Sequence, residues 1–211
     1  MKKLLLLLLV ASSLQAQQAQ EKADEVVIGH MNYKTTFSKH HRYPTHVEWW
    51  VTRAKLECKN PVSRTDKFLP DPQLRKDSDI DDDYVKSGFD RGHLSPAADA
   101  RCNITHMAES FYFTNMAPQY PGLNRGQWKN LEEWTRILAV ENDSVIVKAG
   151  CVGESKRIGK VAVPTHCWKV IHFKNEKEAY VFPNVEERSK SFEMHKVPLD
   201  SVKKLTKLPI K

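Results

Sequence analysis

The sequence predicts an α+β fold in which a mostly antiparallel central sheet is flanked by helices. Short runs rich in β-branched and aromatic residues, separated by turn residues, occur on both sides of the chain's centre. Residues 123–141 instead carry apolar side chains at the i, i+3, i+4 spacing of an amphipathic helix. No βαβ alternation or glycine-rich phosphate loop occurs, which argues against a nucleotide-binding fold.

The N-terminus has the pattern of a signal peptide over residues 1–16. Lys2 and Lys3 precede six leucines and a stretch of small residues, with cleavage expected after Ala16 or alternatively after Ala19. The apolar run is shorter than the ~20 residues of a membrane-spanning helix, so a transmembrane anchor is the less favoured alternative. We therefore expect a secreted or periplasmic protein with no membrane attachment after cleavage.

The composition is that of one globular domain with a modest positive charge. The 211 residues include 33 basic and 26 acidic side chains, a net charge of +7. Without Lys2 and Lys3 there remain 31 basic side chains, and the net charge is +5. This excess favours polyanionic partners but is common among exported proteins without any nucleic-acid role.

The elements follow in order from residue 17. Residues 17–45 are polar with little periodicity, so we expect an extended or poorly ordered arm before a single domain over 46–211. Proline-rich and aspartate-rich residues 58–83 predict a loop, and 103–110 a helical turn. Strands are expected at 46–57, 111–116, 144–149, 159–163, 167–173 and 179–182, and helices at 123–141 and 201–208.

Four cysteines lie after the signal peptide, an even count that suggests two disulfides in an exported protein. The segments around Cys151 and Cys167 resemble neighbouring strands, so we expect these two to pair, which leaves Cys58 with Cys102. Free buried thiols are the alternative. A zinc site is not indicated, because no C-x-x-C or H-x-x-H spacing occurs.

The central stretch 87–99 carries residues suited to phosphodiester hydrolysis. His93 can act as a base near neutral pH, and Arg91 can hold phosphate oxygens through its planar guanidinium. In an extended segment these two side chains share one face. Gly92 between them would permit close approach of a substrate.

A second group of polar residues follows at Asn115, Asn124 and Glu132. Asn124 and Glu132 lie eight positions apart across the start of the predicted helix, on neighbouring faces about 80° apart with ~12 Å of rise. Helical side chains lean towards the N-terminus, so both could serve one hydrated Mg²⁺ ion, which needs few protein oxygens. Taken singly, Asn124 could be a helix cap and Glu132 a solvated residue.

The two blocks together resemble a known family. SGFDRGHLSPAAD over 87–99, followed by FYFTNMAPQ over 111–119 and N-x-x-x-W-x-x-L-E over 124–132, is similar to the DNA/RNA non-specific endonucleases. These are ββα-metal nucleases with an Asp-Arg-Gly-His signature, and they include secreted bacterial nucleases and mitochondrial endonuclease G. The similarity runs from about residue 46 to the C-terminal helix and implies a ββα-metal active site.

Each role that the resemblance implies belongs to a matching position. It implies that His93 is the general base that activates water, Arg91 contacts phosphate, and Asn115 supports the site. Asn124 would be the direct ligand to Mg²⁺, for which Mn²⁺ could substitute, and Glu132 would act on the ion through water. Arg64 is the best match to a further phosphate-binding arginine, with Arg53 as the rival; the role of Asp90 is left open.

The resemblance implies a Mg²⁺-dependent endonuclease that cleaves DNA and RNA with little sequence preference and leaves 5′-phosphates. Two other classes remain open, a catalytically silent nucleic-acid-binding protein and a phosphodiesterase for a smaller substrate. Tight binding without cleavage of polymers in Mg²⁺ would identify the binding protein, and comparison of a dinucleotide with a polymer would identify the phosphodiesterase. Biological role, oligomeric state and any inhibitor partner are not predicted.

Overall fold

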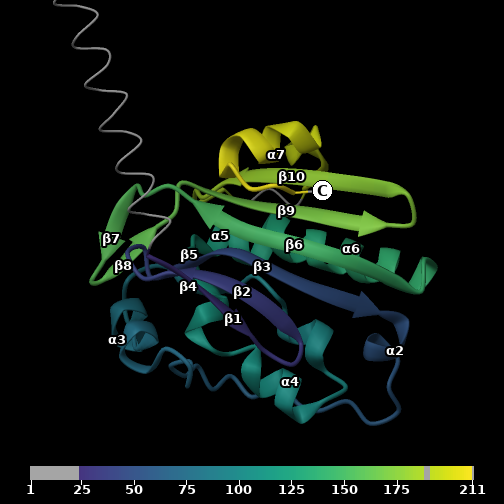
Figure 1. Cartoon of the computed structure of the whole chain (residues 1–211), viewed down its shortest axis with the longest axis horizontal. Helices are drawn as coiled ribbons and strands as arrows, with labels where there is room; N and C mark the ends of the chain where they lie inside the picture. The colour runs from purple at the N-terminus through teal and green to yellow at the C-terminus, as the bar shows by residue number, and fades with distance from the viewer. Residues whose placement is uncertain (1–23, 188–190, 211) are drawn as a thin grey trace, which may run out of the picture.

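A seven-stranded antiparallel sheet forms the frame of the molecule (Figure 1). The computed structural model describes residues 24–187 and 191–210, so the predicted signal peptide lies outside the described residues. The sheet order is β1-β2-β3-β6-β9-β10-β11. These strands are β1 (Glu25–Gly29), β2 (Tyr33–Ser38), β3 (Tyr43–Thr52), β6 (Ser144–Val152), β9 (His166–Phe173), β10 (Glu176–Pro183) and β11 (Lys196–Val197). The predicted α+β class with a mostly antiparallel sheet is confirmed.

Helices cover the two faces of the sheet in different places. Helix α6 (Lys129–Glu141) packs on one face, where Trp49 and Trp128 belong to the main core. Helix α7 (Leu199–Thr206) packs on the other face over β10, where Val202 joins Trp168 and Val170 (Figure 1). Both predicted helices are therefore present, with shifted ends.

Of the expected extended or poorly ordered arm over 17–45, the described part is extended and ordered, and it belongs to the sheet. Strands β1 and β2 pair with each other, and β2 pairs with β3, which begins at Tyr43 and not at residue 46. In β2 the buried side chains of Tyr33, Thr35 and Phe37 alternate with exposed or half-buried ones, the two-residue period of a half-buried strand. The domain therefore starts well before residue 46.

The segment 53–143 leaves the sheet and returns to it at one point. Thr52 of β3 and Ser144 of β6 are register partners, and the Arg53 amide donates to the Asp143 carbonyl at 2.9 Å. This segment contains the two-stranded sheet of β4 (Asp90–His93) and β5 (Met116–Gln119). It also holds helices and turns α2 (Arg53–Leu56), η1 (Arg75–Ser78), α3 (Asp81–Tyr84), η2 (Ala97–Ala100), α4 (Ile104–Glu109), η3 (Phe113–Asn115), α5 (Pro121–Leu123) and η4 (Asn124–Trp128).

Two predicted elements have a different form. The strand expected over 111–116 is a 3₁₀ turn, η3, followed by β5, because the side chains of Thr114 and Asn115 bond to nearby groups and do not alternate across a sheet. The helix expected from residue 123 is interrupted at η4, a π-type turn in which Gly126 has φ −106° and ψ −108°.

The remaining elements lie between or beside the last strands of the large sheet. A small hairpin of β7 (Lys156–Ile158) and β8 (Val161–Val163) lies between β6 and β9 in the chain, and η5 (Glu193–His195) precedes β11.

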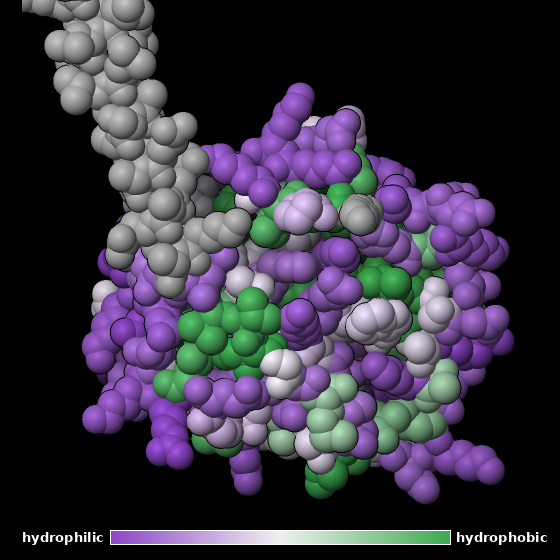
Figure 2. Space-filling view, in the orientation of Figure 1, coloured by the Kyte–Doolittle hydropathy of each residue, from purple (hydrophilic) through white to green (hydrophobic). Residues whose placement is uncertain are grey.

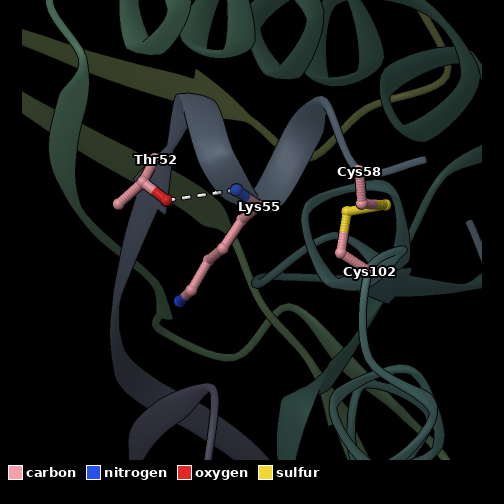
Figure 3. Close-up of a disulfide and its surroundings, with 4 residues drawn as sticks. All are labelled: Thr52, Lys55, Cys58 and Cys102. Carbon is pink, nitrogen blue, oxygen red and sulfur yellow. Dashed lines mark hydrogen bonds between the residues drawn. A yellow bond between two sulfur atoms is a disulfide. The ribbon is translucent and has the colours of Figure 1, made fainter. Parts of the chain in front are cut away.

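One of the two predicted disulfides is present. Cys58, just after α2, is bonded to Cys102, and Thr52 caps α2 by accepting from the Lys55 amide (Figure 3). The pairing of Cys151 with Cys167 is wrong: they are direct partners on β6 and β9, as expected, but both are free thiols. Both are fully buried in the main core, where cysteine packs as a small apolar residue. Burial raises the pKa of the Cys151 thiol.

The surface is mainly hydrophilic, and its hydrophobic side chains form several separate groups on the face shown in Figure 2. Single exposed hydrophobic residues are normal on soluble surfaces. Among the described residues, no helix has the length and apolar character needed to cross a membrane.

Candidate active site

A basic cleft of about 390 Å³ brings the two predicted blocks together. Its polar lining consists of Arg64, Arg91, His93, Asn124, Arg125, Lys129 and Glu132. Four of these side chains are cationic and one is acidic, so the cleft suits a polyanion that binds beside a single carboxylate. His93 of the first block and Asn124 of the second block therefore line the same cleft.

His93 lies at the end of β4 with only 9% of its surface exposed. Its ring packs edge-on against Phe111, with centroids 4.9 Å apart, and near Phe68. Burial, assisted by the charge of Arg64, lowers the pKa of His93 to about 3, so the imidazole stays neutral. The ring also bonds to the Arg91 backbone, while Nε2 has no hydrogen-bond partner in the described structure. We infer that Nδ1 carries the proton and that Nε2 is the basic nitrogen.

Asp90 fixes the amide of Asn124, which answers the open question about its role. Asp90 Oδ2 accepts from Asn124 Nδ2 at 2.9 Å, and its two oxygens also accept from Arg125 at 2.8 and 2.6 Å. Because the amide nitrogen is used in this way, the carbonyl oxygen of Asn124 is the atom that can bind a cation. The arrangement is that of a carboxylate that orients a metal ligand.

Glu132 lies in the first turn of α6, on the floor of the cleft. Burial raises its pKa to about 7; the charge of Lys169 opposes this effect, and Asp99 adds to it. The π-type turn η4 separates Glu132 from Asn124, so the regular helical spacing used in the sequence argument does not apply between them. Both nevertheless line the same cleft.

Arg64 and Arg91 reach the cleft from different segments. Arg91 is held by Asp81, whose Oδ1 accepts from Nε at 2.8 Å, and its guanidinium lies over the rings of Phe68 and Tyr84. Arg64 lies over the ring of Phe111 at 4.8 Å. Both line the cleft, and their phosphate-binding roles stay a prediction.

Arg53, the rival to Arg64, lies elsewhere. It bonds to the Val140 carbonyl and pairs with Asp143 at 3.2 Å, at the junction of β3 and β6. The structure therefore favours Arg64.

Asn115 supports the site but does not line the cleft. It is fully buried; its Oδ1 accepts from the Ser95 amide at 2.9 Å, and its Nδ2 donates to the carbonyls of Ser95 and Ser110. It therefore holds the chain that follows His93. Because its amide is fully used within the protein, Asn115 positions the chain and does not itself face the cleft.

Gly92 permits a close approach of two protein segments. It is buried, and a Cβ at this position would lie 2.2 Å from Gln119 Oε1 on the partner strand β5. A larger residue would therefore disturb the pairing of β4 with β5.

The residues present fit a hydrated hard cation. Asn124 offers one carbonyl oxygen whose amide nitrogen is already bonded, and Glu132 offers a carboxylate in the same cleft. A set of few oxygen donors is typical of Mg²⁺, which retains several waters in proteins. Neither cysteine nor a second histidine lines the cleft, so softer metals have no preferred donors there.

Several site residues were missed by the sequence reasoning. Arg125 and Lys129 add positive charge to the cleft, Asp81 holds Arg91, and Arg136 pairs with the buried Asp99 at 3.3 Å. The sequence contains a signal for one of them. Arg136 follows Glu132 by four residues, about one helical turn, which predicts that the two side chains lie on the same face of the helix.

An antiparallel sheet flanked by helices, with a basic cleft that holds a buried, neutral histidine, defines the class of fold and site to which this chain belongs. The model of the DNA/RNA non-specific endonuclease family matches residues 11–211, and the chain belongs to this family. The resemblance carried by the two sequence blocks is thus confirmed.

Relatives and a solved structure agree. The chain is 33% identical over 170 residues to the mitochondrial Nuclease 1 of Schizosaccharomyces pombe, covering 72% of this chain and 53% of that protein. It is 38% identical over 146 residues to the mitochondrial Endonuclease G of Homo sapiens, covering 60% and 49%. The chain spans about half the length of these relatives. The crystal structure of the EndoG/EndoGI complex matches with a TM-score of 0.77 and 28% identity over 87% of this chain and 84% of that one.

Proposed function

We propose that this chain is a Mg²⁺-dependent endonuclease that hydrolyses phosphodiester bonds of DNA and RNA. The observation that carries the proposal is His93, whose neutral, unpartnered Nε2 lies in the same cleft as Asn124 and the arginines. A protein that only bound nucleic acid would need the arginines but not a buried base.

The chain's residues divide the work of hydrolysis. His93 Nε2 accepts a proton from the attacking water, whose oxygen forms a bond to phosphorus. The bond from phosphorus to the 3′ oxygen breaks, so the product carries a 5′-phosphate. Arg64 and Arg91 offset negative charge on the phosphate oxygens.

Asn124 and Glu132 would hold Mg²⁺, and Mn²⁺ could take its place. The bound ion supplies a Lewis acid that stabilises the charge on the phosphate and on the leaving oxygen. Asp90 keeps the Asn124 amide oriented for this task.

The expected substrates are both nucleic acids, with little sequence preference. A mechanism that uses water does not need the ribose 2′-hydroxyl, and the cleft offers cations that recognise phosphates, which carry no direct base information. Binding should weaken as salt rises.

Digestion of plasmid DNA and of RNA, with Mg²⁺ or with a chelator, tests the proposal. Wild type should degrade both in Mg²⁺, while His93→Ala and Asn124→Ala should lose most activity and retain the wild-type circular dichroism spectrum. His40→Ala, an exposed histidine outside the cleft lining, is the matched control and should remain active. Folded wild type that leaves both polymers intact contradicts the proposal; tight binding without cleavage would identify a binder, and cleavage of dinucleotides alone a small-substrate phosphodiesterase.

Export through the N-terminal signal peptide is part of the proposal. It rests on the Lys2–Lys3 and leucine pattern and on the Cys58–Cys102 disulfide, since disulfides persist mainly in oxidising compartments. Expression of the full chain in a Gram-negative bacterium, followed by fractionation and intact-mass measurement, should give periplasmic or secreted protein that begins after Ala16 or Ala19. Uncleaved protein confined to the cytoplasm or membrane would contradict it.

A further inference from the structure

A group of three metal-binding side chains lies outside the cleft. His40 and His41 come from the turn between β2 and β3, and Glu154 comes from the connection between β6 and β7. One ligand atom of each residue lies within 4.8 Å of the other two, and among the described residues no other such group of three occurs. None of the three lines the cleft, so an ion bound here would be distinct from the one expected beside Asn124.

Bonds outside these three side chains hold the two segments together. The β7–β8 hairpin lies at the end of the sheet where β3 begins, and the His41 carbonyl accepts from the Ala162 amide of β8 at 2.9 Å (Figure 1). Arg157 of β7 donates to the His40 carbonyl at 3.2 Å. The turn that carries the histidines is therefore fixed beside the connection that carries Glu154.

The side chain of Arg157 shows that two of the donors already face a cation. Its guanidinium donates to both carboxylate oxygens of Glu154, at 2.9 and 2.7 Å, and its Nη2 lies 3.3 Å from His40 Nε2. A guanidinium has no acceptor atom, so His40 Nε2 must be the acceptor and carries a lone pair. This neutral form of imidazole is the one that binds metal ions.

His41 supplies the third donor, on an oriented ring. Its Nδ1 lies 3.1 Å from Oγ of the buried Ser38, and its ring stacks on Tyr43 with centroids 5.1 Å apart. A hydrogen bond to one ring nitrogen commonly orients the other nitrogen towards a metal. The rings of His40 and His41 meet edge-on, with centroids 4.9 Å apart.

Two imidazoles and one carboxylate are the donors of zinc sites that keep a fourth position for water. In a tetrahedral site with bonds of about 2.0 Å, the donors lie ~3.3 Å apart, so the widest pair here must close by at most about 1.5 Å. His40 and Glu154 are exposed and can close this distance through changes of rotamer. Mg²⁺ prefers oxygen ligands and is poorly matched to a pair of imidazoles.

We propose that His40, His41 and Glu154 form a Zn²⁺ site, in which the ion takes the position of the Arg157 guanidinium and joins the β2–β3 turn to the β6–β7 connection. The inference goes beyond the proposed function and does not rest on it. The lack of C-x-x-C and H-x-x-H spacing argues against a zinc site made of local pairs, whereas this site combines adjacent histidines with a distant carboxylate.

Calorimetric titration of tag-free protein with Zn²⁺, in a buffer with Mg²⁺ to supply the cleft with its expected ion, tests the inference. Wild type should bind one Zn²⁺, and His40→Ala, His41→Ala and Glu154→Gln should each weaken binding at least about tenfold. The control His106→Ala, which removes a half-buried histidine of α4 outside the group, should bind as wild type does. Arg157→Gln should bind up to about fivefold more tightly, because the ion no longer competes with an exposed ion pair.

Thermal unfolding gives a second measurement. Zn²⁺ at about 100 times its dissociation constant should raise the Tm of wild type by roughly 5–10 °C and leave the Tm of His40→Ala unchanged. If His41→Ala does not fold, His40→Ala and Glu154→Gln complete the series, since both change exposed side chains.

Three results would overturn the inference: no saturable Zn²⁺ binding to wild type, binding that His40→Ala and Glu154→Gln both leave unchanged, or binding that only Arg157→Gln shows. Zn²⁺ binding that His93→Ala abolishes would place the ion in the cleft and would equally refute the site. These measurements involve no nucleic acid, so an inactive wild type would refute the proposed function and leave the Zn²⁺ site standing.

Discussion

Acid pH should destabilise this protein because His93 binds a proton when the chain unfolds. The substitution His93→Ala should remove this part of the pH dependence of stability. Burial lowers the pKa of His93 from 6.5 to about 3, so between these values the unfolded chain binds a proton that the folded chain does not. Stability therefore rises with pH through this window and falls as the pH drops below 6.5. The loss from this one group is about 2 kcal/mol at pH 5 and about 3 kcal/mol at pH 4, relative to pH 8.

Urea unfolding of wild type and His93→Ala in EDTA, at pH 8, 6 and 5, measures this contribution. The alanine variant loses ring packing against Phe111, a cost that is the same at each pH, but it has no histidine to protonate. The difference in unfolding free energy between the two proteins should therefore shrink by about 2 kcal/mol from pH 8 to pH 5. If the unfolding free energies of the two proteins instead change with pH in parallel, within about 0.5 kcal/mol, His93 protonates as readily in the folded state as in the unfolded state. The assignment of a neutral base would then fail.

Four further predictions concern the residues of the expected cation site and the cysteines. Burial raises the pKa of Glu132 to about 7, so Mg²⁺ must displace a proton below that value. The half-saturating Mg²⁺ concentration should therefore rise about fivefold from pH 7 to pH 6, and a flat dependence would contradict this. Asp90→Asn should raise the half-saturating Mg²⁺ concentration by about 10–100-fold, because the Asn124 amide loses its charged partner. Calorimetric titration with Mg²⁺ measures this change. An unchanged Mg²⁺ affinity would show that Asp90 serves only the fold. Replacement of Cys58 and Cys102 by Ser, which opens a loop of sequence separation 44, should lower the unfolding free energy by up to about 4 kcal/mol in urea titrations. A thiol reagent should label no cysteine of folded, unreduced wild type, and it should label Cys151 and Cys167 after unfolding. If no cysteine is labelled after unfolding, Cys151 and Cys167 form a second disulfide.

Residue types and local spacing identified residues that the fold brings to one cleft. Arg91 and His93 share a face because β4 is extended, as their i, i+2 spacing indicates, and Asn124 and Glu132 open on the same cleft. The helical and strand periods located α6, β6, β9 and β10. These features depend on neighbours in the chain, which a sequence displays directly.

Features that depend on distant neighbours were missed. In the sequence, Lys169 is one residue of the strand expected over 167–173. Its surroundings become visible only in the fold, where α6 packs against β9 and the rings of Trp49 and Trp128 lie beside its ammonium group. Asp90 acquired its role from Asn124, 34 residues away. Strand spacing placed Cys151 opposite Cys167 correctly, but spacing alone does not determine whether two opposed thiols are oxidised.

The return of the chain at Thr52 and Ser144 has a consequence for engineering. The residues that line the cleft, from Arg64 to Glu132, lie between two hydrogen-bonded neighbours of the sheet, and the frame itself contributes contacts from Lys169 and Trp49. Residues 53–143 thus form a cassette with adjacent ends, which could be exchanged between related frames at the β3–β6 junction. Compatibility would then depend on whether the recipient frame presents a lysine at the position of Lys169.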